Sequence, residues 1–165
     1  MKIHIIGCSG SGKTFLAKHL SEKYGIPHFD LDDIQWNNSA DGYGTKMPIE
    51  RRSTLLQNIL SNKEWIIEGV YYTWVQQCFE EADVIYVLNP PAYIYKSRIV
   101  KRSTKRKLGL EEGKRETLKS VIALLKWTDT FQNKNLKEIA IILEKYGDKV
   151  AWLSGKKEVR RLIQS

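Results

Sequence analysis

A glycine-rich segment near the N-terminus constrains this chain more than any other feature. It reads GCSGSGKT, from Gly7 to Thr14, and matches the pattern G-x-x-x-x-G-K-[ST] at every fixed position. The β-branched run KIHII precedes it, and a helical pattern from Lys13 to Tyr24 follows it and ends at Gly25. Glycines let the backbone curl with its N–H groups pointing inward, and the helix N-terminus adds a favourable dipole. The segment therefore predicts a phosphate-binding loop; a plain glycine-rich turn is the alternative.

The chemistry of such a loop assigns roles to its residues. We expect Lys13 to reach the β- and γ-phosphates of a nucleotide, and Thr14 to offer its hydroxyl to Mg²⁺. The expected cofactors are therefore ATP and Mg²⁺. The loop residues expected to bind the nucleotide are Gly7, Ser9, Gly10, Ser11, Gly12, Lys13 and Thr14.

Strand and helix patterns alternate along the rest of the chain. Near-continuous apolar runs indicate strands covered on both faces, as in a parallel sheet. Strands are predicted at 2–6, 26–31, 65–69, 84–89 and 149–154. Helices are predicted at 13–24, 48–60, 74–81, after Pro91, at 114–146 with an interruption near Asn133, and at 156–164, whereas 36–47 is predicted as an exposed loop. The pattern predicts one α/β domain over residues 1–165, with three layers and a parallel sheet of about five strands.

Composition excludes several classes of protein. Of the 165 residues, 42% are apolar and 28% are charged, which is typical of a globular chain and not of a disordered one. The apolar runs are far shorter than the roughly 20 residues of a membrane span. No signal-peptide pattern opens the chain, and Cys8 and Cys78 lack metal-ligand spacing, as in a reducing compartment. We expect a cytoplasmic protein.

The net charge of +8 is unevenly distributed. Residues 96–119 contain 10 basic and 3 acidic residues, so this stretch carries a net charge of +7. A concentrated basic stretch attracts phosphate groups on nucleotides, nucleic acids or membrane surfaces. Composition leaves these three partners open.

Two carboxylates follow predicted strands and are candidate partners of the phosphate loop. Asp32 follows the second strand and Glu68 lies at the end of the third. Ligands of open α/β sheets bind at the carboxyl ends of the strands, so both side chains should face the crevice that holds Lys13. We predict Thr14, Asp32 and Glu68 as metal ligands, with ordinary surface carboxylates as the alternative. Alternation along a strand should turn Asp30 and Asp33 away.

Three segments together carry a family resemblance: the phosphate loop, DLDDIQW at 30–36 and WIIEGVYY at 65–72. With the basic stretch, they resemble the adenylate-kinase-like small P-loop kinases, and within that group the bacterial DNA topology modulation proteins (FlaR-type). Asp32 and Trp36 match the family pattern, whereas Glu68 stands where the family has Asp and Val70 where it has Asn. The resemblance implies a nucleoside-monophosphate-kinase-like fold with a short lid.

The basic stretch contains Arg98-Ile99-Val100-Lys101-Arg102, which resembles the R-I-V-G-R segment that enters the lid of adenylate kinases. The resemblance implies that Arg98 lies against the nucleotide and that Arg102 clamps the transferring phosphoryl group. Residues four apart share a helix face, and guanidinium forks match phosphate oxygens. A solvated basic helix is the alternative. The lid would extend over 103–113 and include Gly109 and Gly113.

The resemblance places the acceptor side at 36–60. The candidate acceptor-binding residues are Asp32, Trp36, Arg51, Arg52 and Gly69, with solvated surface arginines as an equal alternative for the two arginines. Near the last strand, Gly155 in the loop Ser154-Gly155-Lys156 would lie beside the adenine base.

The function these features favour is an ATP-dependent phosphotransferase that passes the γ-phosphate to a small nucleotide or nucleoside-like acceptor. The expected catalytic residues are Lys13, Asp32, Arg98 and Arg102. One alternative is a nucleic-acid-binding regulator of DNA topology in which ATP acts as a switch, although no helix-turn-helix, zinc-finger or RNA-binding signature is present. Another is a P-loop ATPase coupled to a protein partner.

Overall fold

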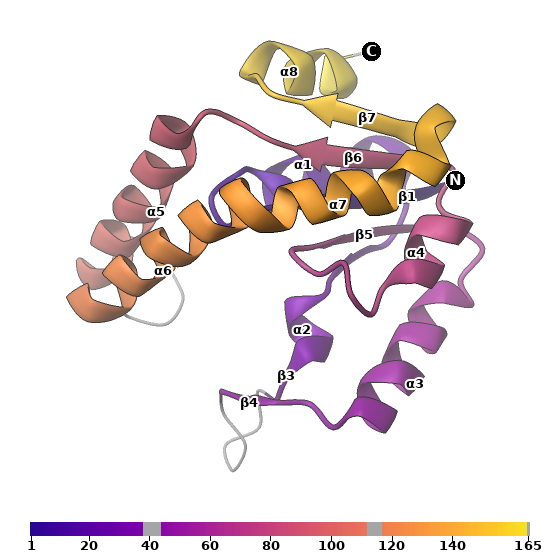
Figure 1. Ribbon diagram of the computed structural model, residues 1–165, viewed down its shortest axis with the longest axis horizontal. Helices are drawn as coiled ribbons and strands as arrows, with labels where there is room; N and C mark the ends of the chain where they lie inside the picture. Colours follow the sequence, from indigo (N-terminus) through magenta and orange to yellow (C-terminus); the bar gives the residue numbers. More distant parts are fainter. Residues whose placement is uncertain (38–43, 112–116, 165) are drawn as a thin grey trace.

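The computed structural model describes residues 1–37, 44–111 and 117–164. Five parallel strands form the central sheet in the order β2-β5-β1-β6-β7 (Figure 1). They are β1 (Lys2–Gly7), β2 (His28–Asp30), β5 (Trp65–Gly69), β6 (Val84–Leu88) and β7 (Val150–Leu153). All five predicted strands are present, and the prediction of a P-loop α/β fold with a five-stranded parallel sheet is confirmed.

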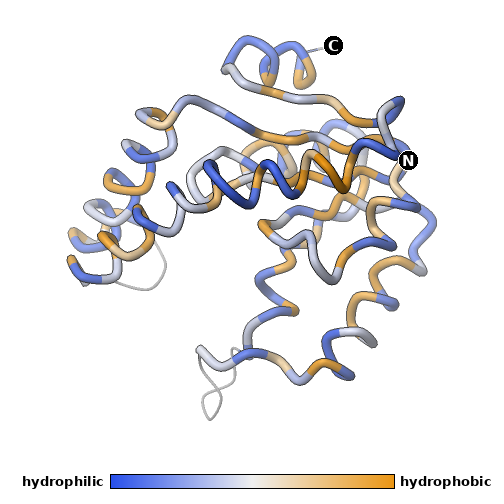
Figure 2. The backbone as a smooth tube through the Cα atoms, in the orientation of Figure 1, coloured by the Kyte–Doolittle hydropathy of each residue, from blue (hydrophilic) through white to orange (hydrophobic). Residues whose placement is uncertain are grey.

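Helices cover both faces of this sheet, which gives three layers. One face carries α1 (Lys13–Tyr24) and α8 (Lys156–Gln164), whose apolar side chains pack with Ile3, Ile5 and Leu153. The other carries α3 (Ile49–Leu60), α4 (Gln76–Glu81) and the helices that follow α5. Figure 2 shows apolar residues concentrated along the strands, as expected for a sheet buried between two helical layers.

The predicted helical stretch with an interruption near Asn133 is a continuous helical path in its described part. It comprises α6 (Leu118–Thr130), a π-helical turn (Phe131–Asn135) and α7 (Leu136–Leu143), followed by a 3₁₀ segment (Glu144–Lys149). In a π turn the hydrogen bonds join residues five apart, so such residues lie over one another. Phe131 and Leu136 are five apart and both are buried in the core. The turn therefore keeps the apolar face of the two helices directed at the sheet.

The basic stretch forms α5 (Ala92–Lys107), which begins after Pro91 and packs beside α6 (Figure 1). The first five residues of the predicted lid, 103–107, are therefore the last turns of this helix and not a loop. Residues 108–111 follow as turns, with Gly109 at a positive φ of 73°. The remaining lid residues, including Gly113, lie outside the described residues.

The prediction of an uninterrupted exposed loop at 36–47 is wrong at its two ends. After the short helix α2 (Asp32–Gln35), β3 (Trp36–Asn37) pairs antiparallel with β4 (Thr45–Lys46). The amide of Met47 also donates to the carbonyl of Gln35 at 2.9 Å. These backbone hydrogen bonds connect segments that a local sequence pattern treats separately. Residues 38–43 lie outside the described residues.

Within residues 1–37, 44–111 and 117–164, no helix is both long enough and apolar enough to span a bilayer.

Candidate functional site

A cavity of about 570 Å³ lies at the carboxyl edge of the sheet and receives residues from the segment after each of the five strands. Its position is the one expected for ligands of open α/β sheets. The predicted site residues that line it are Ser9, Gly10, Ser11, Gly12, Lys13, Thr14, Asp32, Glu68, Gly69, Arg98, Arg102 and Gly155.

The phosphate loop requires glycine for steric reasons. Gly10 has a φ of 77°, and a Cβ there would lie 2.6 Å from the carbonyl oxygen of Tyr95. Gly7 is buried beneath the loop, where a Cβ would lie 2.7 Å from the carbonyl oxygen of Leu88. Gly7 thus allows close contact between β1 and β6, and the cavity itself begins at Ser9. The Lys13 ammonium donates to the carbonyl oxygen of Cys8 at 3.2 Å, within the loop itself.

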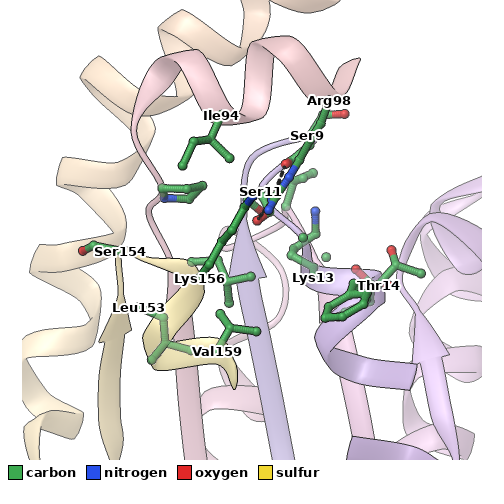
Figure 3. Close-up of a pocket in the computed structure, with 18 of the residues that line it drawn as sticks. Ser9, Ser11, Lys13, Thr14, Ile94, Arg98, Leu153, Ser154, Lys156 and Val159 are labelled. Atoms are coloured by element: carbon green, nitrogen blue, oxygen red, sulfur yellow. Dashed lines mark hydrogen bonds between the residues drawn. The ribbon is translucent and has the colours of Figure 1, made fainter. Parts of the chain in front are cut away.

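Both predicted lid arginines contact the phosphate loop. Nη1 of Arg98 donates to the carbonyl oxygens of Gly10 at 3.1 Å and Ser11 at 2.7 Å, and Figure 3 shows its side chain lying against the loop. Nη2 of Arg102 donates to Oγ of Ser9 at 3.4 Å. The four-residue spacing of the two arginines on α5 places both guanidinium groups on the cavity side of the helix, as the sequence predicts.

Glu68 is buried at the end of β5, with only 1% of the residue exposed. His28 Nε2 lies 3.3 Å from its Oε1, an ion-pair distance without hydrogen-bond geometry. Burial opposes ionisation of this carboxyl, but the His28 imidazole, the charge of Lys13 and the Thr14 hydroxyl outweigh burial, so the pKa of Glu68 lies below its ordinary value. Glu68 is therefore a carboxylate that faces the start of α1.

Asp30 lines the cavity, contrary to the expectation that strand alternation turns it away. β2 ends at Asp30, which is in register with Glu68, and parallel partners in register present their side chains on the same face. Residues two apart on a strand share a face, so alternation does not set Asp30 opposite Asp32, which in any case already belongs to α2. Burial, together with the nearby Glu68 and Asp32 charges, raises the pKa of Asp30 to about 6, although its Oδ1 accepts the Asp32 amide at 2.9 Å. Asp33 is exposed.

Asp32 is held by an aromatic residue of the segment after β5. The Tyr71 hydroxyl donates to Oδ1 of Asp32 at 2.6 Å and also contacts the Trp36 side chain. Burial and the Asp32 carboxylate raise the pKa of Tyr71, so this hydroxyl stays protonated as a donor. Trp36 thus lies behind Asp32, outside the set of described residues that line the cavity.

The two arginines proposed for the acceptor side lie away from the cavity lining in the described part of the chain. Arg51 is exposed. The guanidinium carbon of Arg52 lies 4.4 Å from the centre of the Trp74 ring, and its Nη1 donates to Oε1 of Gln35 at 2.9 Å. Arg52 therefore links α3 to α2 and to the segment after β5.

An apolar wall completes the cavity at the end opposite the carboxylates. It is formed by side chains that the sequence analysis did not select: Leu88, Pro90, Ile94, Leu153 and Val159. Figure 3 shows Ile94 on α5 and Val159 on α8 at this end, with Lys156 between them and the loop. Lys156 and Arg160 add two cations. Such a wall suits the flat apolar faces of a base, next to cations for its phosphates.

The residues present fit a magnesium ion that arrives with a nucleotide. Within the described segments, no three His, Cys, Asp or Glu side chains are grouped as a metal cage. Magnesium at a phosphate site needs only one or two protein oxygens, because phosphates and water supply the other ligands. The buried Oε1 of Glu68, which has no hydrogen-bond partner among the described residues, and the adjacent Thr14 hydroxyl are such oxygens.

Two known proteins are similar to this chain, one in its fold and one in its sequence. The crystal structure of a gluconokinase from Sinorhizobium meliloti 1021 is 12% identical and superposes with a TM-score of 0.56, covering 99% of this chain and 87% of that one. The uncharacterized protein YqaC of Bacillus subtilis (strain 168) is 31% identical over 105 residues, which are 63% of this chain and 57% of that protein. The chain thus spans little more than half of YqaC.

A match to a family model assigns the chain to a protein family. The model of the AAA domain matches residues 3–119, which include the phosphate loop, both carboxylate-bearing strand ends and all of α5. The structural similarity places the whole chain in the kinase-like P-loop fold. The chain therefore belongs to the AAA domain family and has the fold of a small P-loop kinase.

Proposed function

We propose that the protein is an ATP-dependent phosphotransferase that passes the γ-phosphate of ATP to a small nucleotide or nucleoside-like acceptor. One observation carries this proposal: the phosphate loop, the two α5 arginines and the carboxylates after β2 and β5 meet at a single cavity. Phosphoryl transfer depends mainly on positioning and charge stabilisation, and this cavity offers groups for both. Cytoplasmic action is part of the proposal, and the two free, buried cysteines support it.

In this proposal each charged side chain has a role. Lys13 contacts the β- and γ-phosphates, and Thr14 and Glu68 would hold a Mg²⁺ ion that neutralises phosphate charge. Arg98 fixes the loop through the carbonyl oxygens of Gly10 and Ser11, and Arg102 stabilises charge on the transferring group. Asp32 orients the acceptor, with Tyr71 holding its carboxylate in place. Gly155 lies at the base-binding end.

The resemblance to FlaR-type proteins is part of the same proposal. Its support is local: Asp32 lines the cavity, Trp36 contacts the residue that holds Asp32, and Gly69 lines the cavity beside Glu68. A Cβ on Gly69 would lie 2.8 Å from the Leu31 side chain, so glycine is required where β5 meets the segment after β2.

A panel of acceptors tests the activity. Purified protein with ATP and Mg²⁺ is offered nucleosides, nucleoside monophosphates, polyols and sugars, and both ADP and the phosphorylated product are measured. Lys13→Ala should reduce turnover to background, whereas Lys18→Ala, an exposed lysine on the same helix, should leave turnover unchanged. Absence of ADP and of product with every acceptor would overturn the proposal, and hydrolysis without transfer would favour an ATPase.

Nucleic-acid binding is a second candidate, because Lys101, Lys105 and Lys107 are exposed on α5. Fluorescence anisotropy with duplex DNA at low and physiological salt tests it. Affinity that collapses with salt reports nonspecific counterion release, whereas affinity that persists supports a nucleic-acid role.

A further inference from the structure

The charged side chains that line the cavity are segregated along the edge of the sheet. The carboxylates lie at the ends of β2 and β5 or just after them: Asp30, Asp32 and Glu68. The cations follow β1, β6 and β7: Lys13, Arg98, Arg102, Lys156 and Arg160. Since the strand order is β2-β5-β1-β6-β7, the acidic and basic groups occupy opposite ends of one cavity, with the phosphate loop between them.

This segregation separates the places of the two substrates. A triphosphate belongs on the phosphate loop and at the basic end, where opposite charge and the apolar wall are available. The acidic end remains for the acceptor. Oε1 of Glu68 is buried without a hydrogen bond to any described residue, although His28 Nε2 lies 3.3 Å from it, and this is an additional sign that this end receives a ligand or its metal ion, because buried carboxylate oxygens are normally hydrogen-bonded.

Among the described residues, the only lining cation whose charge reaches the acidic end is Lys13 of the phosphate loop, which acts on Asp30 and Glu68 and is already assigned to the phosphates of ATP. Arg52 is occupied by the Trp74 ring and by Gln35, and Arg51 is exposed. One Mg²⁺ beside Glu68 would balance two of the three carboxylate charges at most, so the end would still not be positive. An anionic group placed there would meet like charge in a partly desolvated site.

We propose that the acceptor presents an uncharged hydroxyl group, and no phosphate or carboxylate, to the acidic end of the cavity. This inference rests on the proposed phosphotransferase function and narrows its acceptor to the nucleoside-like or polyol class. The acceptor oxygen forms a bond to the γ-phosphorus as the bond from that phosphorus to the β,γ-bridging oxygen breaks. ADP leaves, and the hydroxyl proton passes to a carboxylate of the acidic end.

A nucleotide probe tests the charge argument without knowledge of the acceptor. Adenosine 5′-tetraphosphate carries one phosphate beyond ATP, directed from the loop toward the acidic end. Isothermal titration with Mg²⁺ should show that the protein binds this probe no more tightly than ATP. A preference of about tenfold or more for the tetraphosphate would overturn the inference, because it would require a cationic acceptor end.

Two matched variants sharpen this test. Asp30→Asn keeps an Oδ1 acceptor for the Asp32 amide but removes a negative charge from the cavity. The ratio of the affinity for the tetraphosphate to the affinity for ATP should therefore rise at least about threefold. Asp33→Asn makes the same change at an exposed neighbour and should leave the ratio unchanged. Equal ratios in all three proteins would contradict the inference.

A second experiment compares acceptors in pairs that differ in charge. Each nucleoside is compared with its own 5′-monophosphate, and a neutral polyol with gluconate, by kcat/KM at saturating ATP. The neutral member of each pair should be preferred. Faster transfer to an anionic member overturns this inference but leaves the phosphotransferase intact, whereas failure to bind ATP at all overturns the proposed function itself.

Discussion

Nη1 of Arg98 lies 2.7 Å from the carbonyl oxygen of Ser11 and 3.1 Å from that of Gly10. A residue on α5 therefore holds the backbone of a loop that precedes it by more than eighty positions in the chain. A Cβ on Gly12 would lie 3.0 Å from the same Nη1, so the guanidinium packs directly on the loop. Hydrogen bonds from a charged donor are stronger than neutral ones, and this pair fixes the loop in the shape that a phosphate needs.

Arg98→Ala should therefore weaken ATP binding even before any direct contact with the nucleotide is considered. Hydrogen bonds to charged groups contribute about 1.5–3 kcal/mol, which corresponds to a rise in Kd of about tenfold or more. Arg98→Lys should recover part of the affinity, because an ammonium keeps the charge but lacks the planar fork. Isothermal titration measures both, with exposed Lys101→Ala as the control on the same helix. An unchanged Kd in Arg98→Ala would contradict this role.

Arg102 should act on the rate more than on binding. Its Nη2 donates to Ser9 Oγ across a long 3.4 Å contact, and its side chain lines the cavity in which the transferring phosphoryl group would lie. We expect Arg102→Ala to lower kcat by about a hundredfold or more, with a smaller change in the KM for ATP. Steady-state kinetics compares it with Lys105→Ala, an exposed residue of the same helix. Equal kcat values would assign Arg102 to the solvated surface.

Local sequence patterns were sufficient for the strands, the phosphate loop and the two α5 arginines. Each depends on residues within one element: an apolar run, a glycine spacing, or a spacing of four on a helix. The central sheet followed because buried strands alternating with helices have few other arrangements. The same reasoning placed Asp32 and Glu68 at one edge, where the structure has them.

Long-range contacts decide what those patterns missed. Asp30 faces the cavity because β2 ends there, and the Leu31 amide then donates to the carbonyl of Glu68 on the neighbouring strand at 2.9 Å. Arg52 is engaged by Trp74, which follows a different strand. The apolar wall joins the starts of α5 and α8, which become neighbours only because β6 pairs with β7. None of these pairings has a signal in the local sequence.

Gly10→Ala should prevent the phosphate loop from closing. The added Cβ would combine a positive φ with a 2.6 Å contact to the carbonyl oxygen of Tyr95, and neither backbone can move freely. Gly25→Ala is the matched control, since Gly25 has a φ of 69° but nothing within 4 Å of its Cβ position. We expect Gly25→Ala to cost about 1 kcal/mol in the free energy of unfolding, and Gly10→Ala to cost more and to abolish ATP binding. Equal losses in thermal unfolding would contradict the steric argument.

Tyr71→Phe should affect acceptor use without affecting ATP affinity. Its hydroxyl holds Asp32 at 2.6 Å, at the acidic end of the cavity. Tyr72→Phe is a matched control, because the Tyr72 hydroxyl also donates to a carboxylate at 2.6 Å, but that carboxylate is Glu138 on α7. We expect Tyr71→Phe to raise the acceptor KM about tenfold, and Tyr72→Phe to change only the stability. Steady-state kinetics with a reactive acceptor measures both KM values. If the two variants had the same acceptor KM, the prediction would be wrong.

His4 should make the folded protein sensitive to acid. Its side chain, on β1, is fully buried and packs edge-on against Phe79, with the two ring centroids 4.9 Å apart. Neither ring nitrogen has a hydrogen-bond partner among the described residues. Burial lowers the pKa of His4 to about 3, against about 6.5 in an unfolded chain. Below about pH 6.5 the unfolded chain therefore binds a proton that the folded chain does not, and the free energy of unfolding falls as the pH falls toward 3.

Urea unfolding at pH 7 and pH 5 measures this loss. From the two pKa values, His4 should contribute about 2 kcal/mol to the drop in the free energy of unfolding between these pH values. His4→Leu should show a drop smaller by that amount, because it cannot bind the proton in either state. His19→Leu, at a partly exposed position of α1, should keep the wild-type drop. If His4→Leu and wild type lost equal stability, the ring of His4 would have to accept a proton in the folded state, which would require a water or a backbone movement that opens the layer between β1 and Phe79.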